Sequence, residues 1–366
     1  PHQRVVKQLE SFGINGGALA WTDSFVTDRR QKVRANGELS EFKPVKSGVP
    51  QGSILGPILF TLFVNDIPSE LETIISMYAD DTKVYTAITS ESSITSLKSD
   101  LRKLETWAQL MQMKFHPAKC KVMHLGKNNP KETYQMKTAE GKYHNLEETE
   151  LEKDLGVEID NRLKFSHHIQ SKINKANRVL GCLKHTFKFL NKEIFTLLYK
   201  SLVRPHLEYA SCIWSPQIKR DQDAIERVQR RATRLLPELR NLPYTSRLQQ
   251  LNLPTLKYRR RRADMIETYR IMTNQHSINS HCQCSLCPNK QLLELSTNTR
   301  TRGHQYKLKT QTATGIRKQF FSTRVTADWN HLEEATVTAE NVNSFKSRLE
   351  REWSNQDLQF CYTFSY

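Results

Sequence analysis

Two adjacent aspartates, Asp80 and Asp81, are the residues in this sequence whose chemistry is easiest to name. β-prone residues precede them at 74–78 and follow them at 84–88, so the pattern predicts two strands joined by a tight turn. A β-turn accepts aspartate readily, and the pair can therefore be the polar tip of an ordinary hairpin. Two carboxylates held on a rigid sheet are also suitable ligands for a hard divalent cation, and the pair alone does not decide between these interpretations.

The residues upstream favour the cation site. An ordered set of motifs leads to the aspartates, with a Leu- and Phe-rich helix predicted after the first: SGVPQGS at 47–53, NDIP at 65–68 and YADD at 78–81. A single YxDD is common, but the ordered set is specific. Through it the chain resembles reverse transcriptases, in particular those of non-LTR (LINE-type) retrotransposons of the jockey kind. The motifs extend to about residue 160, and the resemblance is only general after that.

The resemblance implies an RNA-directed DNA polymerase, whose partners are an RNA template, a DNA primer and deoxynucleoside triphosphates. In such enzymes two Mg²⁺ ions activate the primer 3′-hydroxyl and neutralise charge on the phosphate that it attacks. Asp80 and Asp81 are then the catalytic metal ligands, with Asp80 the more direct one. The implied substrate-binding residues come from the same motifs: Gln51, Gly52, Tyr78 and Ala79.

Two further short patterns resemble the family. Lys119 and Lys121, in a loop that enters a strand, resemble a Lys-x-Lys pair that stabilises triphosphate charge, and an ordinary solvated pair is the alternative. Leu155 and Gly156 lie in KDLGVEID at 153–160, which resembles the hairpin that grips the primer end. We therefore expect a primer grip at this second hairpin.

One catalytic carboxylate of the family is not evident. The resemblance places the first metal ligand at the end of a strand that closes with Phe-Asp, but Asp23, Asp28 and Asp66 lie in helix or loop contexts. Since the chain starts at Pro1, we expect an N-terminally truncated polymerase with an incomplete two-Mg²⁺ site. The alternative is a non-catalytic nucleic-acid-binding remnant of such an element. A viral RNA-dependent RNA polymerase also carries an Asp-Asp turn, but SGVPQGS argues against it.

The composition favours a polyanionic partner. The 366 residues carry 55 Lys and Arg against 38 Asp and Glu, a net charge of +17, and the isoelectric point is about 9.5. Phosphate backbones reward such an excess. The arginines expected to contact nucleic-acid backbone, rather than only solvent, lie in two predicted basic helices: Arg227, Arg230, Arg231, Arg234, Arg259 and Arg260.

The sequence gives no sign of a membrane or secreted protein. No apolar run is long enough to cross a bilayer, and no signal-peptide pattern begins the chain. Seven Cys without regular spacing indicate a reduced, intracellular compartment, either nucleus or cytoplasm. The oligomeric state is left open.

These patterns predict an α+β chain in three parts. Residues 1–165 would form a partial polymerase palm, an antiparallel sheet with packed helices. Residues 166–275 would form a helical thumb with basic helices, and residues 276–366 a basic, mostly helical C-terminal extension with a small Cys cluster. In the first part, Asn36-Gly37 predicts a hairpin between strands at 31–35 and 39–45.

The Cys cluster at His281–Cys287 should not hold zinc. Its three closely spaced thiolates and one adjacent histidine make an incomplete and strained shell, whereas structural zinc takes four ligands, often as two spaced pairs. Metal analysis of the reduced, chelator-washed protein should therefore give well below one zinc per chain. A stoichiometric zinc content would contradict this expectation.

Overall fold

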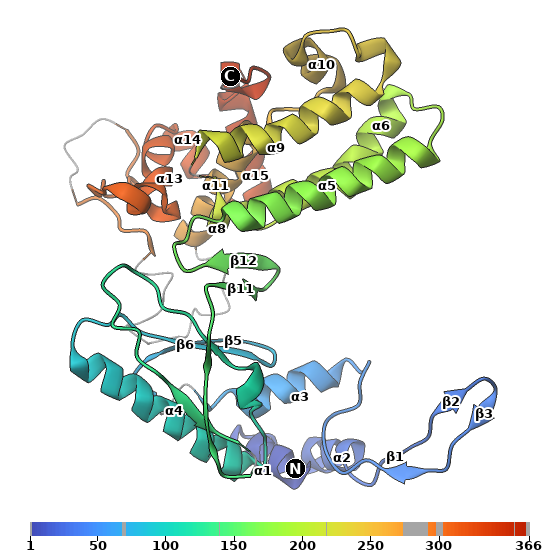
Figure 1. The fold of residues 1–366 in the computed structure, drawn as a ribbon, viewed down its shortest axis with the longest axis vertical. Helices are drawn as coiled ribbons and strands as arrows, with labels where there is room; N and C mark the ends of the chain where they lie inside the picture. Colours follow the sequence, from blue (N-terminus) through green and yellow to red (C-terminus); the bar gives the residue numbers. More distant parts are fainter. Residues whose placement is uncertain are drawn as a thin grey trace. The chain divides into compact units, whose positions relative to one another are not determined.

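The computed structural model describes residues 2–67, 71–138, 140–216, 218–273, 292–297, 303–354 and 356–363. These residues form two compact units, an N-terminal unit (Pro1–Thr149) and a C-terminal unit (Glu150–Tyr366). Helices and small two-stranded sheets occur together (Figure 1), which is compatible with the predicted α+β class. The cluster at 281–287 lies outside the described residues. Within those residues, no helix is both long and apolar enough to span a bilayer.

The N-terminal unit combines helices with short strand pairs. Its helical elements are α1 (His2–Ser11), α2 (Gly16–Val26), α3 (Leu55–Val64), α4 (Glu91–Met111) and the 3₁₀ turn η2 (Pro117–Lys119). Its strands are β1 (Arg30–Gln31), β2 (Arg34–Ala35), β3 (Glu38–Leu39), β4 (Lys43–Pro44), β5 (Ile74–Tyr78), β6 (Asp81–Tyr85), β7 (Lys121–Val122), β8 (Gln135–Lys137), β9 (Tyr143–Asn145) and β10 (Glu147–Glu148).

The strands predicted on either side of the aspartates form the β5–β6 hairpin, although β6 begins at Asp81 and ends at Tyr85, earlier than the predicted run at 84–88. Tyr78 pairs with Asp81, which leaves Ala79 and Asp80 as the turn. One face of the hairpin packs against the apolar core between α3 and α4 through three side chains: Ile75, Met77 and Val84. Because successive side chains alternate between the two faces of a strand, Tyr78 lies on the other face, where it is exposed.

A buried carboxylate fixes the start of this hairpin on α4. Asp100 Oδ2 accepts hydrogen bonds from the backbone N–H groups of Glu72 (2.9 Å) and Thr73 (2.7 Å) and from Thr73 Oγ1 (2.8 Å). Lys103 Nζ lies 3.0 Å from Asp100 Oδ1. Burial raises the pKa of Asp100, but the hydrogen bonds from Thr73 and Lys103 outweigh burial and hold that pKa below its ordinary value. The charged carboxylate therefore holds the two residues that lead into β5, Glu72 and Thr73, in place.

The basic hairpin of β1–β4 is more broken than predicted. β2 and β3 pair across Asn36 and Gly37, whose φ angles of +52° and +91° fit the predicted turn. The expected strands at 31–35 and 39–45 are reduced to two-residue pairs. Every residue in these pairs is exposed, so no buried face supports a longer ladder.

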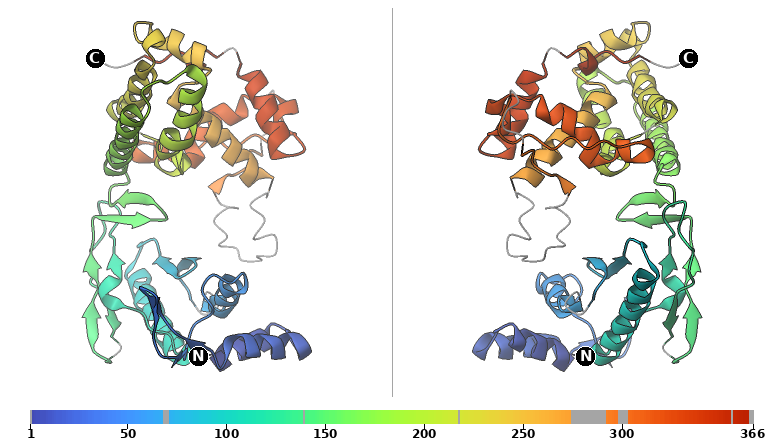
Figure 2. Two further views of the ribbon diagram at one scale, coloured as in Figure 1. Left: turned by 90° about the vertical axis from the view of Figure 1, so that its right-hand side faces the viewer. Right: turned by 90° about the vertical axis from the view of Figure 1, so that its left-hand side faces the viewer.

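The C-terminal unit begins with a hairpin, β11 (Leu151–Asp154) and β12 (Val157–Asp160), which Figure 2 shows in green beside the start of α5. Its α-helices are α5 (Ser166–Thr186), α6 (Lys192–Leu198), α7 (Arg204–Glu208), α8 (Ser211–Trp214), α9 (Lys219–Ala232), α10 (Tyr244–Leu251), α11 (Leu256–Met272), α13 (Phe321–Asn330), α14 (Glu334–Val337) and α15 (Val342–Glu352). Its shorter helical segments are the π-helix η3 (Tyr199–Val203) and the 3₁₀ turns η4 (Thr233–Leu235), η5 (Pro237–Leu239), η7 (Gly315–Gln319) and η8 (Asp357–Gln359).

Two apolar clusters form the core of the C-terminal unit. The first lies among α5, η3 and α9 and includes Ile173 and Tyr199. The second lies among α11, α13 and α15 and includes Trp329 and Phe345. α11 contributes to both, since Leu256 belongs to the first cluster and its following turns to the second. α11 is therefore the element that joins the two halves of this unit.

Replacing Asp100 with Asn should loosen the β5–β6 hairpin. The neutral amide is a weaker acceptor for three hydrogen bonds, so we expect a loss of about 2 kcal/mol. Urea unfolding, monitored through the hydrogen exchange of the amides at 74–85, measures this loss. Glu91→Gln, an exposed change on the same helix, is the control and should cost only a few tenths of a kcal/mol.

The difference in stability between wild type and Asp100→Asn should depend on pH in a defined way. Because folding lowers the pKa of Asp100, its stabilising contribution is complete above the ordinary aspartate pKa and is lost as the pH falls through the folded-state pKa. The stability difference between wild type and Asp100→Asn should hold at neutral pH and shrink below about pH 4. A difference that grows on acidification would contradict this assignment.

Candidate functional site

Asp80 and Asp81 lie at the exposed tip of the β5–β6 hairpin, as the sequence predicts. Ala79 has a φ of +52°, a backbone conformation that costs a non-glycine residue about 1–2 kcal/mol and that recurs at functional sites. The core beneath the hairpin holds this strained turn in place. The turn therefore presents two carboxylates to solvent on a supported element.

The carboxylate oxygens suit Mg²⁺, but the described residues do not supply a two-metal site. Within the described ranges, no group of three or more His, Cys, Asp or Glu side chains is placed to hold a metal ion. Asp66 accepts a hydrogen bond on Oδ1 from Trp107 Nε1 at 3.1 Å, which ties it to the core. Two carboxylates on one turn are fewer than a two-metal polymerase site needs.

The loop that carries Gln51 and Gly52 is held by side chains that lie outside the SGVPQGS motif. The Arg29 guanidinium donates to Gly48 O, and His2 Nε2 lies 3.1 Å from the same oxygen. Gln51 and Gly52 remain exposed, and Gly52 has a φ of +79°. No sequence pattern marks Arg29 and His2 as partners of this loop, since neither belongs to a recognisable motif.

Close packing fixes the end of the same loop. Ser53 Oγ donates to Pro50 O (2.8 Å) and accepts from the Gly56 N–H (2.9 Å). A Cβ at Gly56 would lie 2.9 Å from Pro50 O and 3.0 Å from Ser53 Oγ, so a larger residue does not fit without a shift. Glycine at this position therefore lets the loop fold tightly onto the start of α3 and turn Gln51 and Gly52 outward.

Lys119 and Lys121 are both exposed, but they lie in different elements. Lys119 ends η2, and Lys121 starts β7, where its register partner is Glu147 of β10. The two side chains therefore do not alternate along one strand. Their role at a triphosphate stays a prediction.

Leu155 and Gly156 form the two-residue turn of the β11–β12 hairpin. Asp154 pairs with Val157 across them, and their φ angles are +43° and +87°. β12 packs against α5, so this hairpin belongs to the C-terminal unit although its motif resembles the polymerase region. The Leu155 side chain is 43% exposed and is accessible to a ligand.

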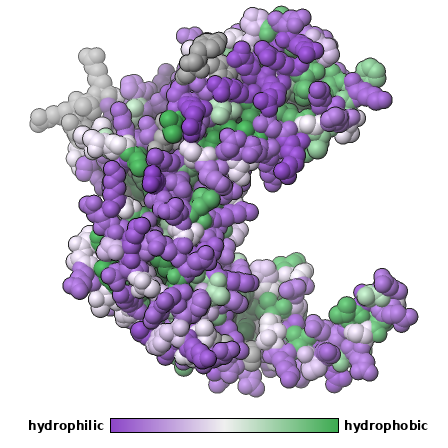
Figure 3. Space-filling model, in the orientation of Figure 1, coloured by the Kyte–Doolittle hydropathy of each residue, from purple (hydrophilic) through white to green (hydrophobic). Residues whose placement is uncertain are grey.

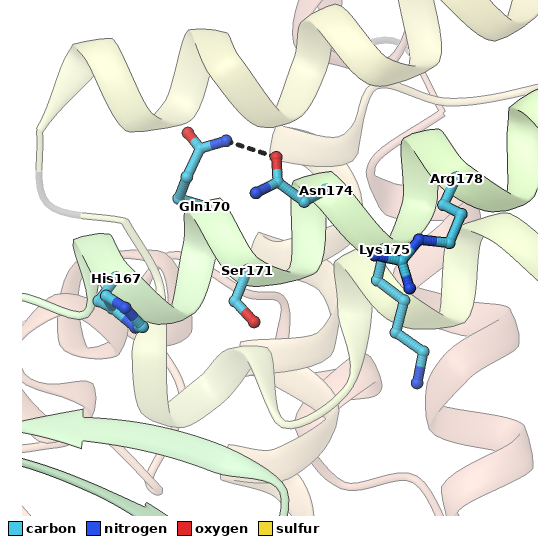
Figure 4. Close-up of a pocket in the computed structure, with 6 residues that line it drawn as sticks. All are labelled: His167, Gln170, Ser171, Asn174, Lys175 and Arg178. Atoms are coloured by element: carbon cyan, nitrogen blue, oxygen red, sulfur yellow. Dashed lines mark hydrogen bonds between the residues drawn. The ribbon is translucent and has the colours of Figure 1, made fainter.

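One face of α5 is polar and open. Six side chains that recur every three or four residues line a shallow hollow on it (Figure 4): His167, Gln170, Ser171, Asn174, Lys175 and Arg178. Gln170 Nε2 donates to Asn174 Oδ1 at 2.8 Å. The sequence does not distinguish this face from an ordinary solvated helix face, because its polar side chains form no recognisable motif. Lys175 and Arg178 give the hollow positive charge that suits an anion.

The basic side of α9 adjoins this face. Arg227 and Arg231 of α9 and Arg234 of the following η4 are exposed, and Arg230 is half-buried. Arg231 Nη1 donates to Asn177 Oδ1 of α5 at 2.9 Å, which brings the two helices' polar surfaces together. The visible face in Figure 3 is mostly hydrophilic, with apolar residues gathered where α5 passes into α6.

Arg259 and Arg260 do not extend this basic surface, which corrects the sequence-based expectation for them. Arg260 is only 3% exposed and lies near the buried carboxylate of Glu226. Arg259 donates to the carboxylate of Glu208. A buried or internally paired guanidinium is not available to an external phosphate, so these arginines stabilise the unit instead.

The comparisons with known proteins agree with the motifs. Residues 1–159 match the family described as reverse transcriptase (RNA-dependent DNA polymerase). The RNA-directed DNA polymerase from mobile element jockey of Drosophila melanogaster is 29% identical over 225 residues, which cover 58% of this chain and 24% of that protein. Its counterpart from Drosophila funebris is 32% identical over 206 residues, covering 51% and 21%. The chain spans about a quarter of the length of these curated relatives.

Proposed function

We propose that this chain, whose residues 1–159 belong to the reverse transcriptase family, acts in RNA-directed DNA synthesis by a non-LTR retrotransposon. The observation that carries the proposal is the Asp80–Asp81 tip. It lies inside the matched region, on a strained turn that the β5–β6 register and the core beneath it hold open to solvent. The exposed Gln51–Gly52 loop in the same region supports it.

In this proposal the residues bind and orient the substrates. Gln51 and Gly52 contact the incoming deoxynucleotide and the template base, with Tyr78 and Ala79 beside them. Lys119 and Lys121 neutralise triphosphate charge. Asp80 and Asp81 offer oxygen ligands for Mg²⁺. The remaining contacts would come from the C-terminal unit.

The C-terminal unit would hold the primer–template. The Leu155–Gly156 turn contacts the primer end, and α5 and α9 contact the phosphate backbone through their exposed cations. In polymerase terms, residues 1–165 would be a partial palm, 166–275 a helical thumb, and 276–366 a basic extension. The exposed charge on α9 and the open polar face of α5 support this assignment.

A second function is nucleic-acid binding without synthesis. The observation that favours it is the carboxylate set: among the described residues, no third metal-ligating side chain joins Asp80 and Asp81. Both functions need the basic surface, and they differ in whether a primer is extended.

Primer extension should separate the two functions. With an RNA template, a DNA primer, deoxynucleotides and Mg²⁺, this chain should bind the primer–template under both functions. The proposed function predicts weak, Mg²⁺-dependent extension of the primer, whereas the second function predicts no extension. The lack of one metal ligand lowers a polymerase rate by a factor of about a thousand or more. Extension at a normal rate would mean that another carboxylate completes the site, and Asp66→Asn would be the first variant to test.

Asp80→Asn should weaken divalent-cation binding without changing nucleic-acid affinity. The change removes one charge at the exposed tip and touches no backbone-binding residue. Mn²⁺ binding, followed by water-proton relaxation, measures the first effect, and fluorescence anisotropy of a labelled primer–template measures the second. Asp28→Asn, another exposed aspartate of the N-terminal unit, is the matched control and should leave both unchanged.

Replacing Arg227, Arg231 and Arg234 with Gln should flatten the salt dependence of binding. Each lost phosphate contact lowers the slope of log affinity against log salt by about 0.7 to 0.9, so three contacts should lower it by about 2 to 3. Anisotropy titrations at several salt concentrations give the slope.

The control for this variant removes the same charge elsewhere on the C-terminal unit. Arg317, Lys318 and Arg351 are exposed, and changing all three to Gln should leave most of the slope intact. Equal slopes for both triple variants would remove α9 from the interface and leave only general charge attraction.

A further inference from the structure

The turn of the β11–β12 hairpin places a leucine where hairpin turns usually carry Asn, Asp or Gly. Both of its residues lie in the left-handed region, with φ of +43° at Leu155 and +87° at Gly156. Glycine adopts this conformation freely, but leucine does so at a cost because its Cβ crowds the backbone. Contacts from outside the turn would offset this cost at Leu155 and favour one conformation of the turn.

Two side chains from elsewhere in the C-terminal unit supply these contacts. Tyr209 Oη donates a hydrogen bond to Leu155 O at 2.8 Å. Lys172 Nζ, from α5, donates to Gly156 O at 2.9 Å. Consecutive carbonyls of the turn are therefore held by two donors from two different elements.

Tyr209 is itself fixed in place. It follows α7 with a φ of −53° and a ψ of 125°, and Ala210 after it has a φ of +53°, so the chain turns sharply there. The buried indole of Trp214 donates from Nε1 to Tyr209 O at 2.6 Å. A Cβ on Gly156 would lie 3.3 Å from Tyr209 Cε1, so the ring also fills the space beside the turn.

The side chain of Lys172 reaches from α5 to the hairpin. Burial lowers the pKa of Lys172, and the nearby Glu158 carboxylate opposes this. Glu158 of β12 is held in turn by Ser171 Oγ at 3.0 Å and by His167 Nδ1 at 2.7 Å. Figure 4 shows His167 and Ser171 projecting from α5 toward the strand. The body of the hairpin is thus fixed along α5, and its tip is fixed by Lys172 and Tyr209.

We propose that Tyr209 and Lys172 are positioning residues that hold the Leu155–Gly156 turn in the one conformation that receives the primer 3′ end. This inference rests on the proposed function of the turn. Neither donor needs to touch the nucleic acid, because each acts on a turn carbonyl. Loss of one donor frees the strained turn, so the primer end is held in place less often while the phosphate backbone remains bound.

The test uses the full chain with a primer whose 3′-terminal base is 4-thiothymidine, and it requires no extension of the primer. Irradiation cross-links the terminal base to nearby residues, and peptide mapping gives the yield at 151–160. Tyr209→Phe keeps the ring and removes the hydroxyl, and Lys172→Met removes the ammonium. Each should lower the yield at 151–160 by about three- to tenfold, while the dissociation constant for the primer–template changes by less than about threefold.

Matched controls separate this role from general effects. Tyr306→Phe removes a hydroxyl from a tyrosine 39% exposed in the same unit, and Lys184→Met removes one exposed charge from the same helix, α5. Both should keep the cross-linking yield within about twofold of wild type. Hydrogen exchange at the Leu155 and Gly156 amides should accelerate in Tyr209→Phe and Lys172→Met and stay unchanged in the controls.

The possible failures are distinguishable. If the wild-type chain binds the primer–template but gives no cross-link at 151–160, the proposed primer contact of the turn is wrong. If wild type cross-links there and both Tyr209→Phe and Lys172→Met keep its yield, the positioning role is overturned. A fall in yield matched by an equal fall in overall affinity would also overturn it, because that result indicates a general loss of folded or charged surface.

Discussion

The position of the candidate metal ligands depends on one buried carboxylate that is not itself a ligand. Asp100 is completely buried, yet three hydrogen bonds and Lys103 keep it charged, and the hydrogen bonds join the residues just before β5 to α4. The apolar face of the hairpin then packs on the same helix. The exposed tip with Asp80 and Asp81 can tolerate its strained turn because the strands below it are fixed at their far end.

In the C-terminal unit, some arginines are paired with carboxylates within the fold, whereas others are exposed on the surface. The arginine run of α11 is paired with carboxylates far away in sequence: Arg259 with Glu208, Arg261 with Asp328, and Arg262 with Glu350. These pairs join the two apolar clusters across α11. The excess positive charge that remains exposed lies on other elements, which include α9. Net charge therefore indicates a polyanionic partner but does not identify the basic helix that binds it.

Local patterns were predictable from the sequence, and distant pairings were not. The Asn36–Gly37 turn and the hairpin that carries Asp80 follow from turn chemistry and β-prone sequence, which act over a few residues. The burial of Arg260 was not predictable, because its environment includes Glu226, 34 residues away. Arg29 at the Gly48 carbonyl was missed for the same reason. The strands of β1–β4 were predicted too long because a β-prone sequence does not reveal whether a buried face exists.

The family match and the structural units divide the chain at different residues, and the β11–β12 hairpin lies between the two boundaries. The family match ends at residue 159, within β12, whereas the structural boundary lies before the hairpin, between 149 and 150. Suppose that recombination joins the polymerase region of one element to the helical region of a related element, with the junction at the end of the match. Leu155 and Gly156 would then come from one element, and Tyr209 and Lys172 from the other. A junction at 149 would keep the hairpin with the helices that support it. Viable chimaeras of such elements should therefore have inherited this hairpin with the sequence that follows it.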